Sequence, residues 1–190
     1  LTTVAEAVST DDHFATRAHI VCMGGALTVP GNVSPFAEAN INQDPEGADL
    51  VFRQCEDITM IGLDVTLQTL LTTVETKRWK DLETAGGDFL AEATNYYIKA
   101  YETTAPHLGG CGLHDPLAVA VAADPSLVET LAINLKVDTE GPSRGRTIAD
   151  ETCLNDPVKS ARVAVGVDTE RFLEEFMSRL TGLARETPVV

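Results

Sequence analysis

Short apolar runs alternate with longer amphipathic stretches along this chain, and that alternation is typical of an α/β fold. Buried strands are predicted over residues 18–23, 57–63 and 162–167, where apolar side chains predominate. Helices are predicted over residues 45–54, 65–74 and 88–102, from 115 onward, and from 169 to about 184. Two further strands, over residues 130–137 and 146–149, flank a turn rich in Gly, Pro and Ser. We therefore expect a mainly parallel central sheet flanked by helices in Rossmann-like layers.

Start signals support three of the predicted helices. Asp44 precedes Pro45 and Asp115 precedes Pro116, which places a capping carboxylate before a proline that suits the first helical turn. Asp168 stands in the same way before the last amphipathic stretch. No internal repeat, low-complexity tract or linker interrupts the 190 residues, so we expect a single domain over residues 1–190.

Charge and composition narrow the classes of function. The net charge is −15, with 29 acidic and 14 basic residues, which argues against a nucleic-acid partner because phosphate contacts need clustered Lys and Arg. No apolar run approaches a membrane span in length, so no membrane partner is expected. The four cysteines show no C-x-x-C spacing, and Cys22 lies in an apolar run. A reducing, cytoplasmic compartment is the simplest expectation.

Candidate binding residues follow the first predicted strand. The chain turns at Gly24-Gly25 and then presents Asn32, Glu38 and Asn40 within nine positions. On extended backbone Glu38 and Asn40 point the same way. A carboxylate accepts hydrogen bonds, and an amide both donates and accepts, so the group suits a ligand rich in hydroxyls. The alternative is that these side chains bond their own loop backbone. Their place at the carboxyl end of a strand favours a site.

A second candidate group begins at Gly112. His114 is the side chain best suited to give a proton near neutral pH, and Asp115 offers the oxygen that hard cations prefer. The alternative is structural, since Asp115 can simply cap a helix and His114 can be a satisfied histidine at its entrance.

Aromatic side chains precede this group on a predicted helix. Tyr97 and Tyr101 are four residues apart and share a face, with Tyr96 beside them. Such a face is commonly core, and the alternative is a platform on which a nucleobase stacks. Asp64, just after the second strand, is interpreted as a loop or cap residue.

These motifs, in this order, resemble the inosine-uridine preferring nucleoside hydrolases, which cleave the N-ribosyl bond of nucleosides. The resemblance covers essentially the whole chain and is carried by Met23-Gly24-Gly25-Ala26, Gly31-Asn32-Val33, Glu38-Ala39-Asn40-Ile41, Asp44-Pro45-Glu46-Gly47-Ala48, Gly62-Leu63-Asp64-Val65-Thr66, Leu113-His114-Asp115-Pro116, Arg144-Gly145-Arg146-Thr147 with Asp150, and Val167-Asp168 with Phe172. Each motif alone is modest, whereas the ordered set is specific.

The resemblance implies roles for individual residues. Asn32, Glu38 and Asn40 would bind ribose hydroxyls, with Met23 packed against the sugar. His114 would contact or protonate the departing base, near Tyr97 or Tyr101. Calcium would be held by the Asp115 carboxylate and by the backbone carbonyl of Thr2, because Leu1-Thr2-Thr3 resembles a segment that binds the ion in the family.

One family motif does not occur in these residues. The family begins with a strand that ends in Asp-x-Asp-Pro-Gly-x-Asp-Asp, and that cluster supplies most calcium ligands, ribose contacts and the base that activates water. The 190 residues contain no such sequence. The chain is therefore expected to be the C-terminal portion of a nucleoside hydrolase fold, with an incomplete calcium site and little activity by itself.

The expected activity is ribonucleoside hydrolysis in purine and pyrimidine salvage, by a homodimer or homotetramer. Two other classes of protein stay open. One is a non-catalytic pseudoenzyme that binds ribose or nucleosides. The other is a different α/β protein, such as a small-molecule transferase, that shares only the architecture.

Overall fold

The structure, a computed structural model, describes residues 1–11 and 13–186. The chain forms two compact units. The first, called the sheet unit, comprises Leu1–Val65 and Ala118–Val167. The second, called the helical unit, comprises Thr66–Leu117 and Asp168–Val190. The expectation of a single domain over residues 1–190 stays a prediction.

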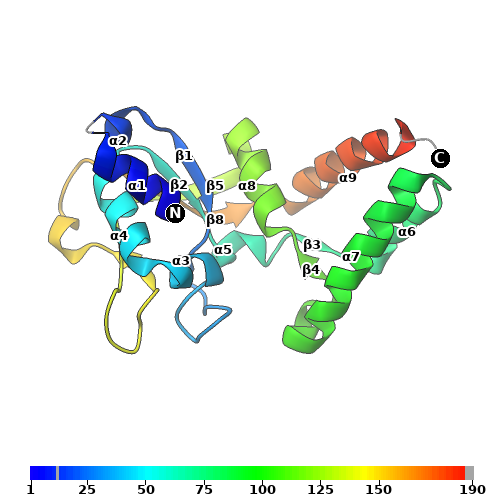
Figure 1. The fold of residues 1–190 in the computed structure, drawn as a ribbon, viewed down its shortest axis with the longest axis horizontal. Coiled ribbons are helices and arrows are strands. Elements are labelled where there is room, and N and C mark those ends of the chain that lie inside the picture. The colour runs from blue at the N-terminus through cyan, green and yellow to red at the C-terminus, as the bar shows by residue number, and fades with distance from the viewer. Residues whose placement is uncertain (12, 187–190) are drawn as a thin grey trace. The chain divides into compact units, whose positions relative to one another are not determined.

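A four-stranded sheet forms the centre of the sheet unit (Figure 1). Its strands, in spatial order, are β1 (Ile20–Met23), β2 (Ile58–Ile61), β8 (Ala161–Val167) and β5 (Val128–Ile133). β1 pairs with β2 and β2 with β8 in parallel, whereas β5 pairs with β8 antiparallel. The predicted mainly parallel α/β fold is confirmed.

Helices cover this sheet and complete its core. The helices that begin in the sheet unit are α1 (Thr2–Thr10), α2 (Phe14–Arg17), α3 (Ala39–Gln43), α4 (Pro45–Gln54) and α5 (Leu63–Thr66). Val8 of α1 and Phe52 of α4 join Met60 and Val163 of the strands in one buried apolar cluster. Cys22 belongs to the same cluster, and burial raises the pKa of its thiol to about 12. Cys22 thus packs as a small apolar side chain, as the sequence predicts.

The helix predicted over residues 45–54 is confirmed as α4, and its start has a clear cause. The Asp44 carboxylate accepts a hydrogen bond from the Gly47 N–H at 2.9 Å, and Pro45 occupies the first turn. The carboxylate satisfies one unpaired donor of the helix N-terminus, and Pro45 removes another because it has no N–H.

The strand predicted over residues 130–137 is wrong in its extent, because two strands occupy this region. β5 ends at Ile133, and β6 (Leu135–Val137) pairs instead with β7 (Thr147–Ala149) in a separate antiparallel hairpin. Asn134 lies between them, and its side chain bonds the Ser160 N–H at 2.9 Å and the Val158 carbonyl at 3.1 Å. Two short 3₁₀ turns flank these strands, at Pro125–Leu127 and Glu151–Cys153.

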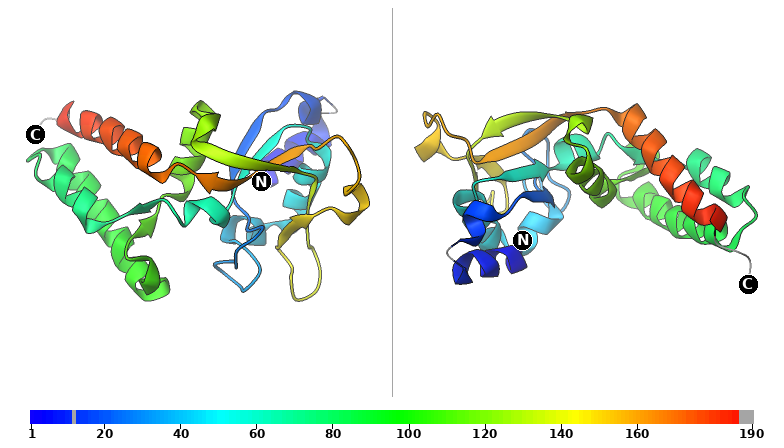
Figure 2. Two further views of the ribbon diagram at one scale, coloured as in Figure 1. Left: turned by 180° about the vertical axis from the view of Figure 1, so that it is seen from behind. Right: turned by 90° about the horizontal axis from the view of Figure 1, so that it is seen from above.

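Among the described residues, the helical unit contains a short two-stranded antiparallel sheet, whose strands are far apart in the sequence, and three α-helices that lie wholly within it. Its elements are β3 (Leu70–Leu71), α6 (Thr73–Lys80), α7 (Ala85–Thr104), a 3₁₀ turn (Pro106–Leu108), β4 (Cys111–Gly112) and α9 (Thr169–Glu186). Helix α8 (His114–Ala123) begins in this unit and continues into the sheet unit. The views in Figure 2 show α6, α7 and α9 lying against one another, and contacts join all three pairs.

The single helix predicted over residues 65–74 is wrong. α5 ends at Thr66, and β3 then pairs with β4 before a new helix begins. The new start is a capping box, in which the Thr72 hydroxyl accepts from the Val74 N–H and Glu75 accepts from the Thr72 N–H. Such a box terminates one element and starts another within three residues.

The predicted helix over residues 88–102 and the last predicted helix are confirmed, as α7 and α9. Trp79 is fully buried in this unit, and its indole N–H donates to Thr181 of α9 at 3.1 Å. Asp168 caps α9 by accepting from the Arg171 N–H at 3.1 Å. Within residues 1–11 and 13–186, none of the helices combines the length and the hydropathy that crossing a membrane requires.

Candidate functional site

The first candidate group lies where two parallel strands of the sheet end. β1 ends at Met23, and the chain continues past the end of β2, with the Gly24 N–H donating to the Ile61 carbonyl at 3.2 Å. Gly25 has a φ of +86°, and a Cβ there would lie 2.7 Å from the Met60 sulfur. Only glycine fits this turn without strain. Strand ends of this kind are where open α/β sheets bind ligands.

Glu38 anchors the loop that follows, which we call the Asn32 loop (residues 24–38). Its carboxylate is buried, with 2% of the residue exposed. It accepts from three backbone N–H groups, those of Gly25 at 2.9 Å, Asn40 at 2.9 Å and Ile41 at 3.2 Å. A carboxylate has about four acceptor positions, so most of its capacity serves the backbone.

Asn40 and Met23 lie together beside this carboxylate. The Asn40 side-chain amide donates to the Met23 carbonyl at 3.3 Å and to the Met23 sulfur at 3.2 Å. The expectation that Glu38 and Asn40 lie on extended backbone is wrong, because Glu38 is the N-cap of α3 and Asn40 is in its first turn. The Glu38 side chain is joined to Asn40 through the Asn40 backbone N–H at the helix cap, not through strand alternation.

Asn32 bonds the same segment. Its side-chain oxygen accepts from the Ala39 N–H at 2.9 Å, and the Asn32 N–H donates to the Ala37 carbonyl at 3.1 Å. The side chain stays exposed. The structure thus joins Met23, Glu38 and Asn40 by hydrogen bonds, and Asn32 bonds the backbone of Ala37 and Ala39 on either side of Glu38.

Asp64, interpreted from the sequence as a loop or cap residue, lies in the first turn of the short helix α5. Its buried carboxylate accepts from the Leu27 N–H at 2.9 Å, the Thr28 N–H at 2.7 Å and the Thr28 hydroxyl at 2.6 Å. Asp64 follows β2, so an acidic residue from the neighbouring strand end holds the Asn32 loop.

The second candidate group lies in the helical unit and is centred on His114. One ring nitrogen, Nδ1, is 2.7 Å from the Thr66 hydroxyl, and the other, Nε2, is 2.6 Å from the Tyr101 hydroxyl. A Cβ on Gly112 would lie 2.7 Å from Nε2, so glycine at that position leaves room for the ring. Both nitrogens face hydroxyls that donate or accept, and the imidazole is therefore oriented in either tautomer.

The tyrosines extend this group to the surface. The Tyr97 and Tyr101 hydroxyls are 3.4 Å apart and their rings meet edge to face, with centroids separated by 5.0 Å. Burial raises the pKa of Tyr101 above its ordinary value, and the hydrogen bond with the Tyr97 hydroxyl raises it further. The Tyr101 phenol therefore keeps its proton at neutral pH. Tyr97 is 45% exposed, and Tyr96 points to solvent with 80% exposed.

A cavity of 360 Å³ opens onto this group. Tyr97, Gly112, His114 and Asp115 supply polar or backbone surface to its wall, and Trp79 and Phe176 supply aromatic surface. An apolar wall with a few polar groups is typical of a small-molecule site.

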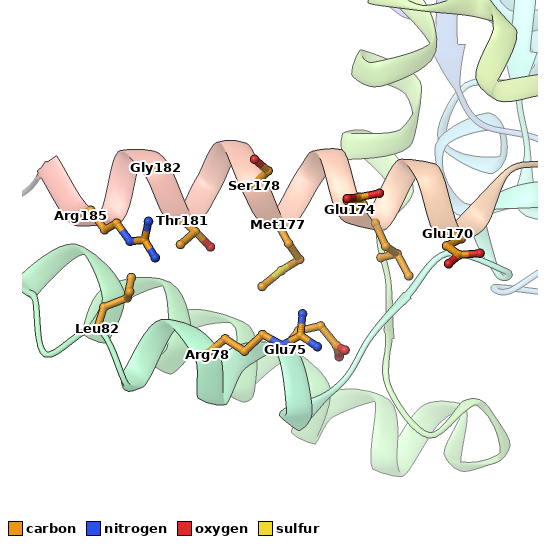
Figure 3. Close-up of a pocket in the computed structure, with 11 residues that line it drawn as sticks. Glu75, Arg78, Leu82, Glu170, Glu174, Met177, Ser178, Thr181, Gly182 and Arg185 are labelled. Carbon is orange, nitrogen blue, oxygen red and sulfur yellow. The ribbon is translucent and has the colours of Figure 1, made fainter.

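A second cavity of the helical unit, of 880 Å³, holds none of the candidate residues. It lies between α6 and α9, where Figure 3 shows Glu75, Arg78 and Leu82 facing Met177, Thr181 and Arg185.

The two candidate calcium ligands, Thr2 and Asp115, belong to different units of the chain. Thr2 opens α1 in the sheet unit, where its hydroxyl donates to Asp44 at 2.5 Å, and Asp115 opens α8 in the helical unit. In the described part of the chain, no three His, Cys, Asp or Glu side chains are grouped so that they could hold a metal ion. Calcium takes about six to eight oxygens, so these residues alone do not fit the ion.

Sequence reasoning missed the side chains that hold the candidate residues. Thr66 bonds His114, Thr147 accepts from the Ala26 N–H at 3.0 Å, and Arg146 bonds carbonyls of the Asn32 loop. Thr66, Arg146 and Thr147 stand in motifs that carry the resemblance, but no local pattern signals their partners, because each acts across a long sequence separation. Arg146 is also the first residue of the strand predicted over residues 146–149.

Comparison with known proteins identifies the family. The sequence profile described as inosine-uridine preferring nucleoside hydrolase matches residues 1–174. The enzyme of that name from Crithidia fasciculata is 34% identical over 174 residues, which are 90% of this chain and 55% of the relative. A pyrimidine-specific ribonucleoside hydrolase of Shigella boydii is 34% identical over 164 residues, which are 86% of this chain and 52% of the relative. The chain thus spans about half the length of the curated relatives it matches.

Solved structures agree with the sequence match. A purine-preferring ribonucleoside hydrolase from Gardnerella vaginalis is 63% identical with a TM-score of 0.92, over 97% of this chain and 58% of that one. An inosine-uridine preferring nucleoside hydrolase from Bacillus anthracis is 28% identical with a TM-score of 0.72, over 95% of this chain and 57% of that one. This chain belongs to the inosine-uridine preferring nucleoside hydrolase family.

Proposed function

We propose that this chain supplies the sugar-binding and base-binding residues of a ribonucleoside hydrolase, which cleaves the N-ribosyl bond to give ribose and a free base. The observation that carries the proposal is the family match over residues 1–174, which includes both candidate groups. Such an enzyme is a hydrolase that acts on N-glycosyl compounds.

Ribose would be bound beside the end of β1. Asn40 and Asn32 offer amide groups to sugar hydroxyls, and Met23 offers an apolar surface to the ring. Glu38 uses three backbone N–H bonds to fix Asn40 and Gly25, so its part is to hold these groups as well as to accept from a hydroxyl. Preorganised contacts of this kind lower the barrier by fixing the sugar in a reactive pose.

The leaving base would meet the His114 group. When the bond between C1′ and the base nitrogen breaks, the electron pair leaves with the base, and His114 or Tyr101 donates a proton or a hydrogen bond to it. The oxygen of a water molecule bonds to C1′ through a transition state with oxocarbenium character, and the water's proton passes to a carboxylate base. That base would come from the family's Asp-x-Asp-Pro-Gly-x-Asp-Asp motif, which the 190 residues do not contain. Proton transfer from a positioned side chain contributes typically about 10²–10⁴-fold to such a rate.

Calcium enters this proposal only as a partial site. Asp115 and the Thr2 carbonyl are the two groups that this chain would contribute. They are too few for calcium, which takes about six to eight oxygens. We also propose that the enzyme acts in nucleoside salvage in the cytoplasm, as a homodimer or homotetramer, without nucleic-acid or membrane partners.

Purine nucleosides are the proposed preferred substrates. The Gardnerella relative, at 63% identity, is described as purine-preferring, whereas relatives at 34% identity are named for inosine and uridine or for pyrimidines. Higher identity favours the first, because base selectivity depends on the side chains that line the cavity at His114.

A chimaeric protein tests the proposal. The 58% of the Gardnerella hydrolase that this chain matches is replaced by the 190 residues, and hydrolysis of inosine, adenosine, uridine and cytidine is followed by release of reducing sugar. We expect turnover of all four with purine nucleosides preferred. A folded chimaera without turnover, beside an active parent enzyme, would contradict the proposal.

A non-catalytic nucleoside-binding protein is the second candidate, because the hydrogen bonds that hold Glu38 and Asn40 would serve ligand binding alone as well as catalysis. It predicts that the chimaera binds inosine, measured by calorimetry, but releases no ribose. A transferase that shares only the architecture predicts neither result.

A further inference from the structure

We propose that Arg146 is a positioning residue that fixes the Asn32 loop in its sugar-binding shape. The inference rests on the proposed function, since it assigns a residue to the same ribose subsite. It concerns a side chain that approaches the loop from a segment more than 100 positions away in the sequence.

The guanidinium group of Arg146 bonds three backbone carbonyls of the loop. Nη2 donates to the Leu27 carbonyl at 2.6 Å, and Nη1 donates to the Val29 carbonyl at 2.6 Å and to the Phe36 carbonyl at 3.2 Å. These carbonyls lie on both sides of Asn32 in the sequence. A planar group with five donors can bond three acceptors at once, which a lysine ammonium on a flexible stem does with less fixed geometry.

The loop needs such support because it has little regular structure of its own. Its internal backbone bonds run from the Gly31, Asn32 and Val33 N–H groups to the Pro35 and Ala37 carbonyls, at 3.1–3.3 Å. Leu27 is held at both of its backbone groups. Its N–H donates to the Asp64 carboxylate, and its carbonyl accepts from the Arg146 guanidinium. The loop is therefore clamped by charged side chains from two other segments.

Arg146 is itself held by the turn between β6 and β7. Its N–H donates to the Ser143 carbonyl at 2.8 Å, and its carbonyl accepts from the Asp138 N–H at 2.9 Å. A Cβ on Gly145 would lie 2.9 Å from the Ala37 Cβ, so this turn packs closely on the loop. Figure 1 and the left panel of Figure 2 show the two loops, blue and yellow, side by side at one end of the sheet unit.

The chain offers a matched control in the same turn. Arg144 bonds Glu46, with Nη2 donating to Oε2 at 2.9 Å, and touches no carbonyl of the Asn32 loop in the described contacts. Arg144→Met and Arg146→Met therefore remove the same charge from the same turn, and only the second releases the loop.

The test combines amide exchange of the 190-residue chain with kinetics of the chimaera. In Arg146→Met, the Gly31, Asn32 and Val33 amides should exchange at least about tenfold faster, whereas amides of β2 and α4 keep their rates. In the chimaera, kcat for inosine should fall roughly ten- to a hundredfold, with a smaller change in KM, because a loosened loop misplaces the sugar. Arg144→Met should leave both readouts unchanged, and Arg146→Lys should restore part of the loss.

A double-mutant cycle separates positioning from general support. If Arg146 acts by placing Asn32, the kcat effect of Arg146→Met should shrink to less than about threefold in an Asn32→Ala background. Equal effects of Arg146→Met and Arg144→Met on exchange and kcat would overturn the inference. If the unmodified chimaera is inactive, the proposed function fails, and the exchange rates alone decide whether Arg146 holds the loop.

Discussion

At the scale of single residues, the polar side chains of the candidate sugar site make most of their hydrogen bonds with the backbone. Glu38 and Asp64 are both nearly buried, and together they accept from five N–H groups and one hydroxyl. A buried donor without a partner costs about 1–3 kcal/mol, so these carboxylates determine the loop shape. Glu38 is thus both a candidate binding residue and a support for the loop, whereas Asp64 supports the loop.

Glu38→Gln should lower the stability of the chain. The amide keeps one acceptor oxygen and turns an NH₂ group toward an N–H donor, so at least one of the three backbone bonds is lost. We expect a loss of about 1–3 kcal/mol in the free energy of unfolding, measured by urea titration. Glu6→Gln, an exposed position on α1, is the matched control. Equal stabilities of the two variants would refute this account of Glu38.

The Tyr101 hydroxyl orients His114 and keeps its own proton, because burial raises its pKa. Tyr101→Phe in the chimaera removes the 2.6 Å bond to Nε2 and leaves Thr66 on Nδ1. One neutral hydrogen bond is worth about 1 kcal/mol, so kcat should fall roughly three- to tenfold.

Tyr97→Phe serves as the comparison for Tyr101→Phe. In the described contacts the Tyr97 hydroxyl bonds only the Tyr101 hydroxyl, at 3.4 Å, and removing it should lower kcat by less than about threefold. A larger loss of kcat in Tyr97→Phe than in Tyr101→Phe would contradict the proposal that Tyr101 is the tyrosine that orients His114.

The candidate residues themselves could be predicted from the sequence, whereas their partners could not. Asn32, Glu38, Asn40 and His114 stand in local motifs with a known order. Arg146 acts on carbonyls more than 100 positions away, and nothing in its own neighbourhood signals that contact.

At the scale of elements, short-range signals predicted the helices that carry clear caps. Asp44 and Asp168 cap α4 and α9 as expected. The failure over residues 65–74 has the same physical origin, because the Thr72 and Glu75 capping box starts α6 where apolar periodicity alone suggested continuity. The division of β5 from β6 at Asn134 depends on tertiary bonds to Val158 and Ser160, which the local sequence does not reveal.

The amino ends of the parallel strands carry an ion cluster opposite the sugar loop. Asp57, before β2, pairs with Arg162 of β8 and with His19, before β1. The hydrogen bond with Arg162 lowers the pKa of Asp57 below its ordinary value of 3.8, and the hydrogen bond with His19 lowers it further. A lowered pKa means that the folded state binds the proton less readily than the unfolded state.

Asp57→Asn should therefore change the acid end of the stability profile. The contribution of Asp57 is fully present above pH 3.8 and is lost as the pH falls through its lower folded-state pKa. Urea unfolding at pH 6 should show the wild type more stable than Asp57→Asn, and the difference should shrink below pH 3.8. Asp11→Asn, which removes an exposed partner of Arg17, controls for surface charge. A difference that stays constant down to pH 2.5 would contradict the assignment.

At the scale of the whole molecule, the chain provides two groups of candidate residues in two separate units, and it spans about half the length of its curated relatives. Each group is internally well bonded. Among the described residues, neither group contains the clustered carboxylates that would hold calcium for an attack by water.

The isolated 190 residues should bind calcium weakly or not at all and should not turn over inosine. One carboxylate and one carbonyl do not replace the roughly six to eight oxygens that the ion takes. Calorimetric titration with calcium chloride and a reducing-sugar assay of the purified chain, beside the chimaera, check this. Hydrolysis of inosine by the purified chain at a rate near that of the chimaera would show that the remaining half is dispensable.

The central claim is that the segment from Met23 to Asn40 is a ribose subsite, and a pair of asparagines in one short helix tests it most directly. Asn40 bonds Met23 at the end of β1, whereas Asn42 lies two positions later in α3 with its side chain exposed. We predict that Asn40→Ala lowers kcat/KM for inosine in the chimaera by at least about tenfold, and that Asn42→Ala changes it by less than about twofold. Equal kcat/KM values for the two variants would contradict the claim.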